Sequence, residues 1–133
     1  MKREIKFRAY HNNENKMYKV FRFCNAYVKV ILGIGTSSDI IPINLFKPIM
    51  QFTGLKDKNG IEIYEGDIVK IEFKEEFNSK NYINISEIIW SESSLRWDVP
   101  VENGAKYGLP LNWGGYESLE IIGNIHEHSN LLC

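Results

Sequence analysis

The amino-acid sequence predicts a mainly β protein: a small SH3-like or partly open β-barrel with an N-terminal β-hairpin extension and a short C-terminal helical turn. Short runs alternate apolar and polar residues with a period of two, which is the pattern of half-buried strands. Gly, Pro, Asn and Asp separate these runs, and no long stretch has the 3.6-residue period of a helix. About seven or eight short strands fit this pattern, and a barrel suits that number because closure removes exposed strand edges.

The length of 133 residues predicts a single domain with one modest core. We expect three parts: basic strands over 1–32, a loop over 33–49 and the barrel core over 50–132. The chain is 44% hydrophobic and lacks an apolar run of about 18 residues, which excludes both disorder and a membrane-spanning helix. The N-terminus lacks an apolar signal segment and the two cysteines, Cys24 and Cys133, lie far apart, so we expect a cytoplasmic protein with reduced thiols.

The N-terminal strands begin at Arg3–Ala9, where apolar and charged residues alternate. A polar, asparagine-rich reversal leads into Met17–Phe23 and Tyr27–Leu32, which are rich in residues that favour strands. Gly, Ser and Pro interrupt residues 33–49 repeatedly, so we expect a loop there with at most one short extended piece, Ile40–Ile43.

The clearest element is a hairpin within residues 50–73. Two runs of strand character, Met50–Leu55 and Ile61–Phe73, flank a five-residue connection that ends in Asn-Gly. Because Asn and Gly tolerate positive φ, we assign Asn59 and Gly60 to a tight turn.

The triplet Glu65-Gly66-Asp67 interrupts the second run of this hairpin. In a structural interpretation, Gly66 supplies the φ of a sharp turn and Asp67 accepts hydrogen bonds from main-chain N–H groups. In a functional interpretation, Glu65 and Asp67 hold Mg²⁺ or share a proton. The structural interpretation explains all three residues and the functional one explains two, so we favour a structural turn.

The second half of the chain predicts another hairpin. Tyr82–Trp90 has strand character, but its isoleucines change phase, which indicates a bulge near Ser86 or Glu87. The chain then turns and alternates again over Leu95–Val99, and we expect Pro100 to end that strand.

The C-terminal region predicts one more strand after a long connection. Residues 101–115 are dense in Gly, Pro and Asn and are expected to form a loop. The last strand covers Ser118–Ile125, where Gly123 allows a bulge or a close approach of the backbone. A single helical turn is expected to dock Leu131 and Leu132.

Charge is distributed unevenly along the chain. Residues 1–30 hold eight Lys or Arg and two Glu, a net charge of +6, whereas the remainder carries −7. A row of cations on strands binds phosphates in a salt-dependent way, so candidate nucleic-acid contacts are Lys2, Lys6, Arg8, Arg22 and Lys29. The overall pI of about 6.3 is far from that of a dedicated nucleic-acid binder, and a solvated face or a docking face for another subunit explains the same residues.

We expect most aromatic residues in the core, because they supply most of the area that a small β domain buries. Trp113 lies in a Gly-rich loop and is the leading interface candidate. Three further aromatic residues could belong to such an interface: Tyr107, Phe21 and Phe23.

Two histidines near the C-terminus form the remaining constellation. His126 and His128 would point the same way in an extended strand and could bind a metal with His11 or Glu127. Such sites need three or four convergent ligands and support from neighbouring groups, which the spacing does not provide. We therefore expect no metal and no cofactor.

Three blocks of the sequence resemble the YopX family, whose members are encoded by phages and prophages of Gram-positive bacteria. The central block spans Met50–Gly60 and Glu62–Val69, the opening block is Arg3–Ala9, and the closing block is Ile121–Glu127 with Leu131-Leu132. The resemblance implies a β-rich phage protein that self-associates and whose biochemical role is unassigned, and it supplies no catalytic residue. Where the family closes with Tyr, Glu, Asn and Pro, this chain has His126, Glu127, His128 and Ser129.

These observations favour a non-enzymatic binding module that forms homo-oligomers in the cytoplasm of a bacterial host. No membrane partner and no small-molecule substrate are indicated. The first alternative is a weak nucleic-acid binder that uses the basic strands. The second is an enzyme or metal-binding protein that uses Asp67 with Glu65, or His126 with His128.

Overall fold

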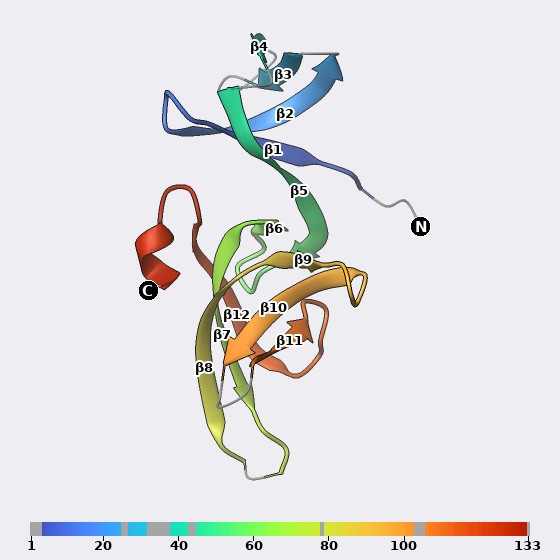
Figure 1. The fold of residues 1–133 in the computed structure, drawn as a ribbon. Coiled ribbons are helices and arrows are strands. Elements are labelled where there is room, and N and C mark those ends of the chain that lie inside the picture. Colours follow the sequence, from blue (N-terminus) through green and yellow to red (C-terminus); the bar gives the residue numbers. More distant parts are fainter. Residues whose placement is uncertain are drawn as a thin grey trace. The chain divides into compact units, whose positions relative to one another are not determined.

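The computed structural model describes residues 4–24, 27–31, 38–42, 45–77, 79–102 and 106–132. Nearly all regular structure in these ranges is β-strand, arranged in three antiparallel sheets of six, three and three strands (Figure 1). The prediction of a mainly β fold is therefore confirmed. The sheets are open and do not close into a barrel, which corrects the barrel expectation. None of the helices in the described ranges has the length and apolar character needed to cross a membrane.

The chain divides into two compact units, an N-terminal unit, Met1–Phe52, and a C-terminal unit, Thr53–Cys133. The N-terminal unit contains β1 Phe7–His11, β2 Lys16–Cys24, β3 Tyr27–Ile31, β4 Ser38–Pro42 and most of β5 Phe46–Lys56. These strands belong to a sheet of order β4-β3-β2-β1-β5-β6, whose last strand, β6 Glu62–Tyr64, comes from the C-terminal unit. Ala9, Tyr18 and Val30 form a small core there, since Ala9 pairs with Tyr18 across the sheet and their side chains share one face.

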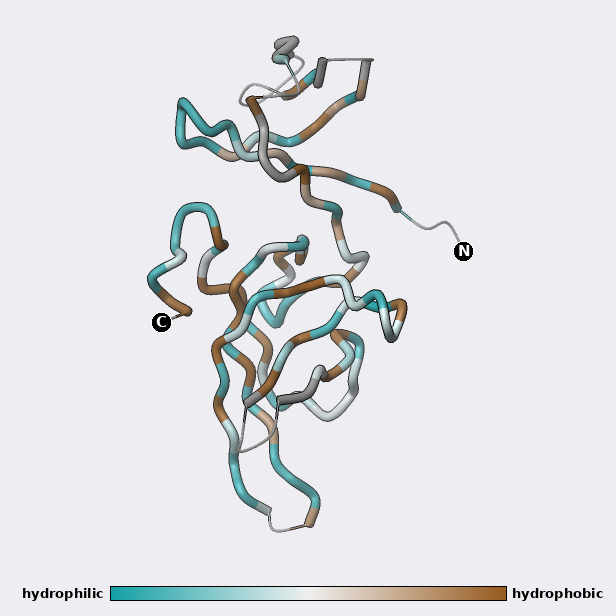
Figure 2. The backbone as a smooth tube through the Cα atoms, in the orientation of Figure 1, coloured by the Kyte–Doolittle hydropathy of each residue, from teal (hydrophilic) through white to brown (hydrophobic). Residues whose placement is uncertain are grey.

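The C-terminal unit holds the remaining strands and the larger core. Its elements are β6 Glu62–Tyr64, β7 Asp67–Lys74, β8 Asn81–Glu87, β9 Ile89–Ser91, β10 Arg96–Glu102, β11 Lys106–Pro110, β12 Tyr116–Asn124 and a 3₁₀ turn, η2, Ser129–Leu132. Apart from β6 and η2, these elements form the sheets β12-β7-β8 and β11-β10-β9. Figure 2 shows apolar and polar residues alternating along these strands, and the inward residues Val69, Ile71 and Phe73 pack with Val99 and Val101.

Several predicted boundaries were wrong in the N-terminal unit. The first strand begins at Phe7 and extends to His11, and the expected loop over 33–49 contains β4 and the start of β5. Of the predicted extended piece, Ile40–Ile43, residue 43 lies outside the described residues. Two prolines hid these strands in the sequence, because proline is usually interpreted as a strand breaker. Pro42 is the last residue of the edge strand β4, and Pro48 lies at a register shift between β5 and β1, both places where a sheet accepts proline.

The region after Pro100 also differs from expectation. Pro100 lies inside β10, opposite Gly108, and residues expected to be a loop form β11. β9 pairs with β10 only over Arg96–Asp98, so the missing N–H of Pro100 costs no bond to β9. Leu95, expected on the strand, lies in the turn before it with φ 52° and is 75% exposed.

The turn before β6 is held by the buried carboxylate of Asp57. Its Oδ1 accepts hydrogen bonds from the N–H groups of Asn59 (2.9 Å) and Ile61 (3.0 Å), and its Oδ2 accepts one from Ile121 of β12 (3.0 Å). Gly60 has φ 79°, as the predicted turn requires, whereas Asn59 does not adopt positive φ. Asp57 therefore connects a local turn to a strand 64 residues away.

These contacts also set the ionisation of Asp57. Burial by itself would raise the pKa of the carboxyl, but the N–H groups of Ile121, Ile61 and Asn59 and the charge of Lys58 outweigh burial and hold the pKa below its ordinary value. A lowered pKa means that the ionised carboxylate stabilises the fold above its unfolded-state pKa of about 3.9 and loses this effect as the pH falls through the folded-state pKa.

We predict that Asp57→Asn lowers the free energy of unfolding at pH 7 by about 2 to 4 kcal/mol. An amide cannot offer acceptors to all three N–H groups, and its NH₂ would face a main-chain donor. Urea unfolding followed by circular dichroism measures the loss, and the difference from wild type should shrink below about pH 4. Glu120→Gln on β12 is the matched control, because its partly exposed ion pair with Lys58 contributes less than about 1 kcal/mol.

Candidate functional site

The turn at Gly66 is the centre of the C-terminal unit. Gly66 is buried and has φ 82°, a left-handed conformation that favours glycine. Its N–H donates to the carbonyl of Ile88 (3.0 Å), and its carbonyl accepts from the N–H of Ile125 (2.9 Å). The N–H of Ile88 donates in turn to the carbonyl of Asp67 (2.8 Å). This turn therefore joins the start of β7 to the break between β8 and β9 and to the end of β12.

The carboxylate of Asp67 takes part in the same turn. It is 2% exposed, and its Oδ2 accepts the N–H of Tyr64 at 2.8 Å. One oxygen of the carboxylate thus faces the main chain, which is compatible with a structural turn at Gly66 and Asp67. The predicted bulge near Ser86 or Glu87 does not occur in the register of β8 with β7; the strand instead ends at Glu87, and the chain breaks at Ile88 before β9 begins.

Glu65 lies near a second carboxylate that the sequence did not single out, Glu87. Burial raises the pKa of Glu87, and the negative charge of Glu65 raises it further. Two carboxylates alone do not make a cation site, and within the described ranges no three His, Cys, Asp or Glu side chains are placed to hold a metal ion.

The histidines are held in a turn and not in an extended strand. Oδ1 of Asn124 accepts the N–H groups of His126 and Glu127, each at 3.0 Å. The Nδ1 of His128 accepts the N–H of Asn124 at 3.3 Å, and its ring lies 2.8 Å from the position of a Cβ on Gly123. Gly123 follows a register shift in β12, so the predicted bulge is confirmed, and the close neighbour is an imidazole.

Trp113 packs within its own unit. Its ring meets Phe73 edge to face at 5.7 Å and Tyr116 at 5.0 Å, and it covers the side of the larger core. The main chain of Tyr107 pairs with Val101 in β11, and its side chain lies outside the described residues. Trp113 therefore packs against the core of its own unit, and its interface role stays a prediction.

The basic strands bring several cations onto one face of the N-terminal unit. The register pairs Arg8 with Lys19 and Arg22 with Lys29, so these four side chains share a face. Lys19 and Arg22 are exposed, whereas Arg8 is partly buried. Lys19 was missed because a bulge at Phe21 changes the phase of β2.

The other basic and aromatic residues of the N-terminal unit differ in their contacts and in their exposure to solvent. Lys6 pairs with Glu4 at 3.1 Å and lies over the ring of Phe52, and Lys2 is outside the described residues. Phe21 is 62% exposed beneath the ammonium of Lys29 (5.6 Å). Phe23 is 44% exposed and meets Phe7 edge to face at 5.2 Å.

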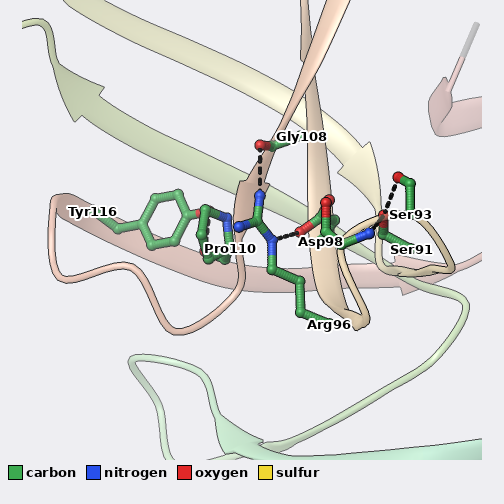
Figure 3. A network of polar contacts seen from close by, with 8 residues as sticks. Ser91, Ser93, Arg96, Asp98, Gly108, Pro110 and Tyr116 are labelled. Atoms are coloured by element: carbon green, nitrogen blue, oxygen red, sulfur yellow. Dashed lines mark hydrogen bonds and ion pairs between the residues drawn. The ribbon is translucent and has the colours of Figure 1, made fainter.

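A polar network on β10 and β11 was not anticipated (Figure 3). The Nε of Arg96 donates to the buried Asp98 at 2.6 Å, and its Nη2 donates to the carbonyl of Gly108 at 3.4 Å. Tyr116 donates its O–H to the carbonyl of Pro110 (2.9 Å), and its pKa is raised by burial and then by the charge of Asp98. A Cβ at Gly108 would collide with the Asp98 carboxylate. The network thus ties the two strands together.

We predict that Gly115→Ala destabilises the protein by about 1 to 3 kcal/mol, because a Cβ there would overlap the six-membered ring of Trp113 and displace it from Phe73. The adjacent Gly114→Ala is the matched control: its Cβ position has no neighbour within 4 Å, and we expect a change within about 0.5 kcal/mol. Thermal unfolding with tryptophan fluorescence compares the two. Equal stabilities would contradict the packing of Trp113.

Comparisons with known proteins agree with the family resemblance. The family model described as YopX protein matches residues 6–133. The crystal structure of protein EF1440 from Enterococcus faecalis is similar to this chain, with a TM-score of 0.54 and 26% sequence identity over 99% of this chain and 100% of that chain. No curated protein matches the sequence significantly. Since the family model covers nearly the whole chain, this protein belongs to the YopX family.

Proposed function

We propose that this YopX-family protein is a phage or prophage accessory protein of the bacterial cytoplasm, a non-enzymatic binding module that self-associates. One observation carries the proposal: the boundary between the two compact units is also a boundary in charge. Residues 1–52 hold nine Lys or Arg and three Asp or Glu, a net charge of +6, whereas residues 53–133 hold seven and fourteen, a net charge of −7.

Opposite charges on two units of one chain favour contacts between copies. The basic unit presents exposed Lys19 and Arg22, and the acidic unit presents exposed Glu92, Glu117 and Glu127. Complementary surfaces of this kind steer association and fix its orientation more than they add affinity. Two copies can therefore approach with the basic unit of one facing the acidic unit of the other.

The placement of the reactive side chains supports a role in binding. Asp57 and Asp67 accept main-chain hydrogen bonds, and the imidazole of His128 accepts one from Asn124. Carboxylates and imidazoles that serve as acceptors for the backbone are held for structure. What the chain offers to other molecules is then its charged and apolar surface.

We predict that Arg22→Glu weakens self-association at 50 mM salt by roughly 1 kcal/mol, or about fivefold in the dissociation constant. Lys56→Glu is the matched control: it changes the net charge equally but lies in the acidic unit, so association should persist. Size-exclusion chromatography with light scattering measures both. A monomer at high protein concentration and low salt would refute association between the basic and acidic units.

Nucleic-acid binding is a second candidate, favoured by the shared face of Lys19, Arg22 and Lys29 with exposed Phe21 beside them. Bases stack on exposed aromatic rings while cations contact the phosphates.

We predict for this candidate that a labelled single-stranded oligonucleotide binds at 50 mM salt and that its dissociation constant is about tenfold higher at 200 mM salt. Phe21→Ala should cost about 1 to 3 kcal/mol of binding free energy, measured by fluorescence anisotropy. Phe77→Ala, at a fully exposed ring between β7 and β8, should leave binding unchanged. Absence of binding at 50 mM salt would remove this candidate.

A further inference from the structure

The sheet β12-β7-β8 has two edges that differ in their protection. At the β12 edge, the carbonyl of Leu119 accepts the N–H of Lys58 (3.0 Å), and the N–H of Ile121 donates to Asp57 (3.0 Å). The turn before β6 therefore covers that edge. Within the described part of the chain, the strand neighbour of β8 is β7. β10 contacts β8 from the core side, where Ser86 donates its O–H to the carbonyl of Pro100 (2.6 Å).

The C-terminal turn η2 contacts β8, but the strand itself lacks the sequence devices that usually protect an edge. Between Asn81 and Ser86 it has no proline and no charged residue. Its register with β7 runs without a bulge from Ile68 opposite Glu87 to Lys74 opposite Asn81. Its outward face presents Ile83, 61% exposed, and Ile85, 47% exposed. An unbulged edge with two exposed isoleucines is suited to pairing with another strand.

The neighbouring strand surrounds these isoleucines with charges of both signs. On β7, Lys70 lies opposite Ile85 and Glu72 lies opposite Ile83. Cross-strand partners share a face, so each isoleucine has one charge beside it on its own sheet. This face is locally balanced although the C-terminal unit as a whole is acidic.

We propose that β8 pairs antiparallel with β8 of a second copy, with Ile83 opposite the partner's Ile85 and Asn84 on the two-fold axis. The proposal rests on the self-association proposed above and names an additional surface for it. Side chains alternate along a strand, so only registers that keep the isoleucines on one face are compatible. Of these, the register centred on Asn84 makes two Ile–Ile pairs, whereas a shift of two residues in either direction leaves one.

The charges agree with this register. One row across the joined sheets reads Lys70, Ile85, the partner's Ile83 and the partner's Glu72, and the symmetric row reverses it. Opposite charges thus flank each apolar pair. At the end of β8, Asn81 would face the partner's Glu87, with Lys74 on the adjoining β7 position. Lys74, which also pairs with Glu117 at 3.6 Å, would there lower the pKa of Glu87, against the burial and the charge of Glu65 that raise it.

Salt distinguishes this contact from one between oppositely charged units. Two acidic C-terminal units repel each other at long range, and salt screens this repulsion, with a Debye length of about 10 Å at 0.1 M and about 3 Å at 1 M. Apolar pairs persist at high salt. The β8 contact therefore strengthens with salt, whereas a contact between the basic and acidic units weakens.

Sedimentation velocity of the full chain at 1 M NaCl tests the proposal. Wild type should form a dimer at high protein concentration, and Ile83→Lys should raise its dissociation constant at least about tenfold, because a lysine would face the partner's Ile85. Leu95→Lys is the matched control, since Leu95 is 75% exposed but lies in the turn between β9 and β10, and the dimer should persist.

Cross-linking tests the register itself. In a Cys24→Ser, Cys133→Ser background with circular dichroism matching wild type, Ile83→Cys with Ile85→Cys should give an interchain disulfide on mild oxidation, because the two positions face each other across the axis. Asn81→Cys with Ile83→Cys should not, since neither cysteine faces another.

The possible results of these experiments distinguish the β8 contact from charge-driven association of the two units. Association at low salt that vanishes at 1 M NaCl would overturn the β8 contact and leave charge-driven association standing. A dimer at 1 M NaCl that Ile83→Lys leaves intact would also overturn the β8 contact. A monomer under both conditions would overturn both proposals.

Discussion

The left-handed conformation of Gly66 is the constraint on which the C-terminal unit depends. Its main-chain groups reach Ile88 and Ile125, so one residue joins three segments that are far apart in sequence. A residue with a side chain would be strained at φ 82° in this buried position. The turn therefore sets where β7 begins, where the chain leaves β8 for β9, and where β12 ends.

Acidic and amide side chains stabilise other turns of the chain. Asp57, Asp67 and Asn124 each accept main-chain N–H groups that a turn leaves without ladder partners. Buried main-chain donors are costly when unsatisfied, so these side chains stabilise the turns. These three side chains therefore serve the fold of the turns in which they lie.

Two kinds of surface remain, and they respond to salt in opposite ways. Binding through the basic face over β1, β2 and β3 would depend on charge, whereas binding through the outward face of β8 would depend on the apolar side chains of Ile83 and Ile85. Under the two proposals made above, the protein would assemble through the first surface at low salt and through the second at high salt. Membership in the YopX family is compatible with such a role, and the similarity to protein EF1440 spans both units.

The sequence by itself determined the strands with strict alternation and the turns whose chemistry is local. β7 and the turns at Gly60 and Gly66 needed only neighbouring residues, since φ preferences and period-two patterns act over a few positions.

The tertiary structure alone decided the partners. It placed Ile121 on Asp57, packed Trp113 against Phe73, and carried β10 through Pro100 to pair with β11. It also covered the β12 edge of one sheet while β8 forms the other edge, and it left the sheets open. These features depend on contacts between distant segments, and the alternation within a strand specifies which face is buried but not which strand will lie beside it.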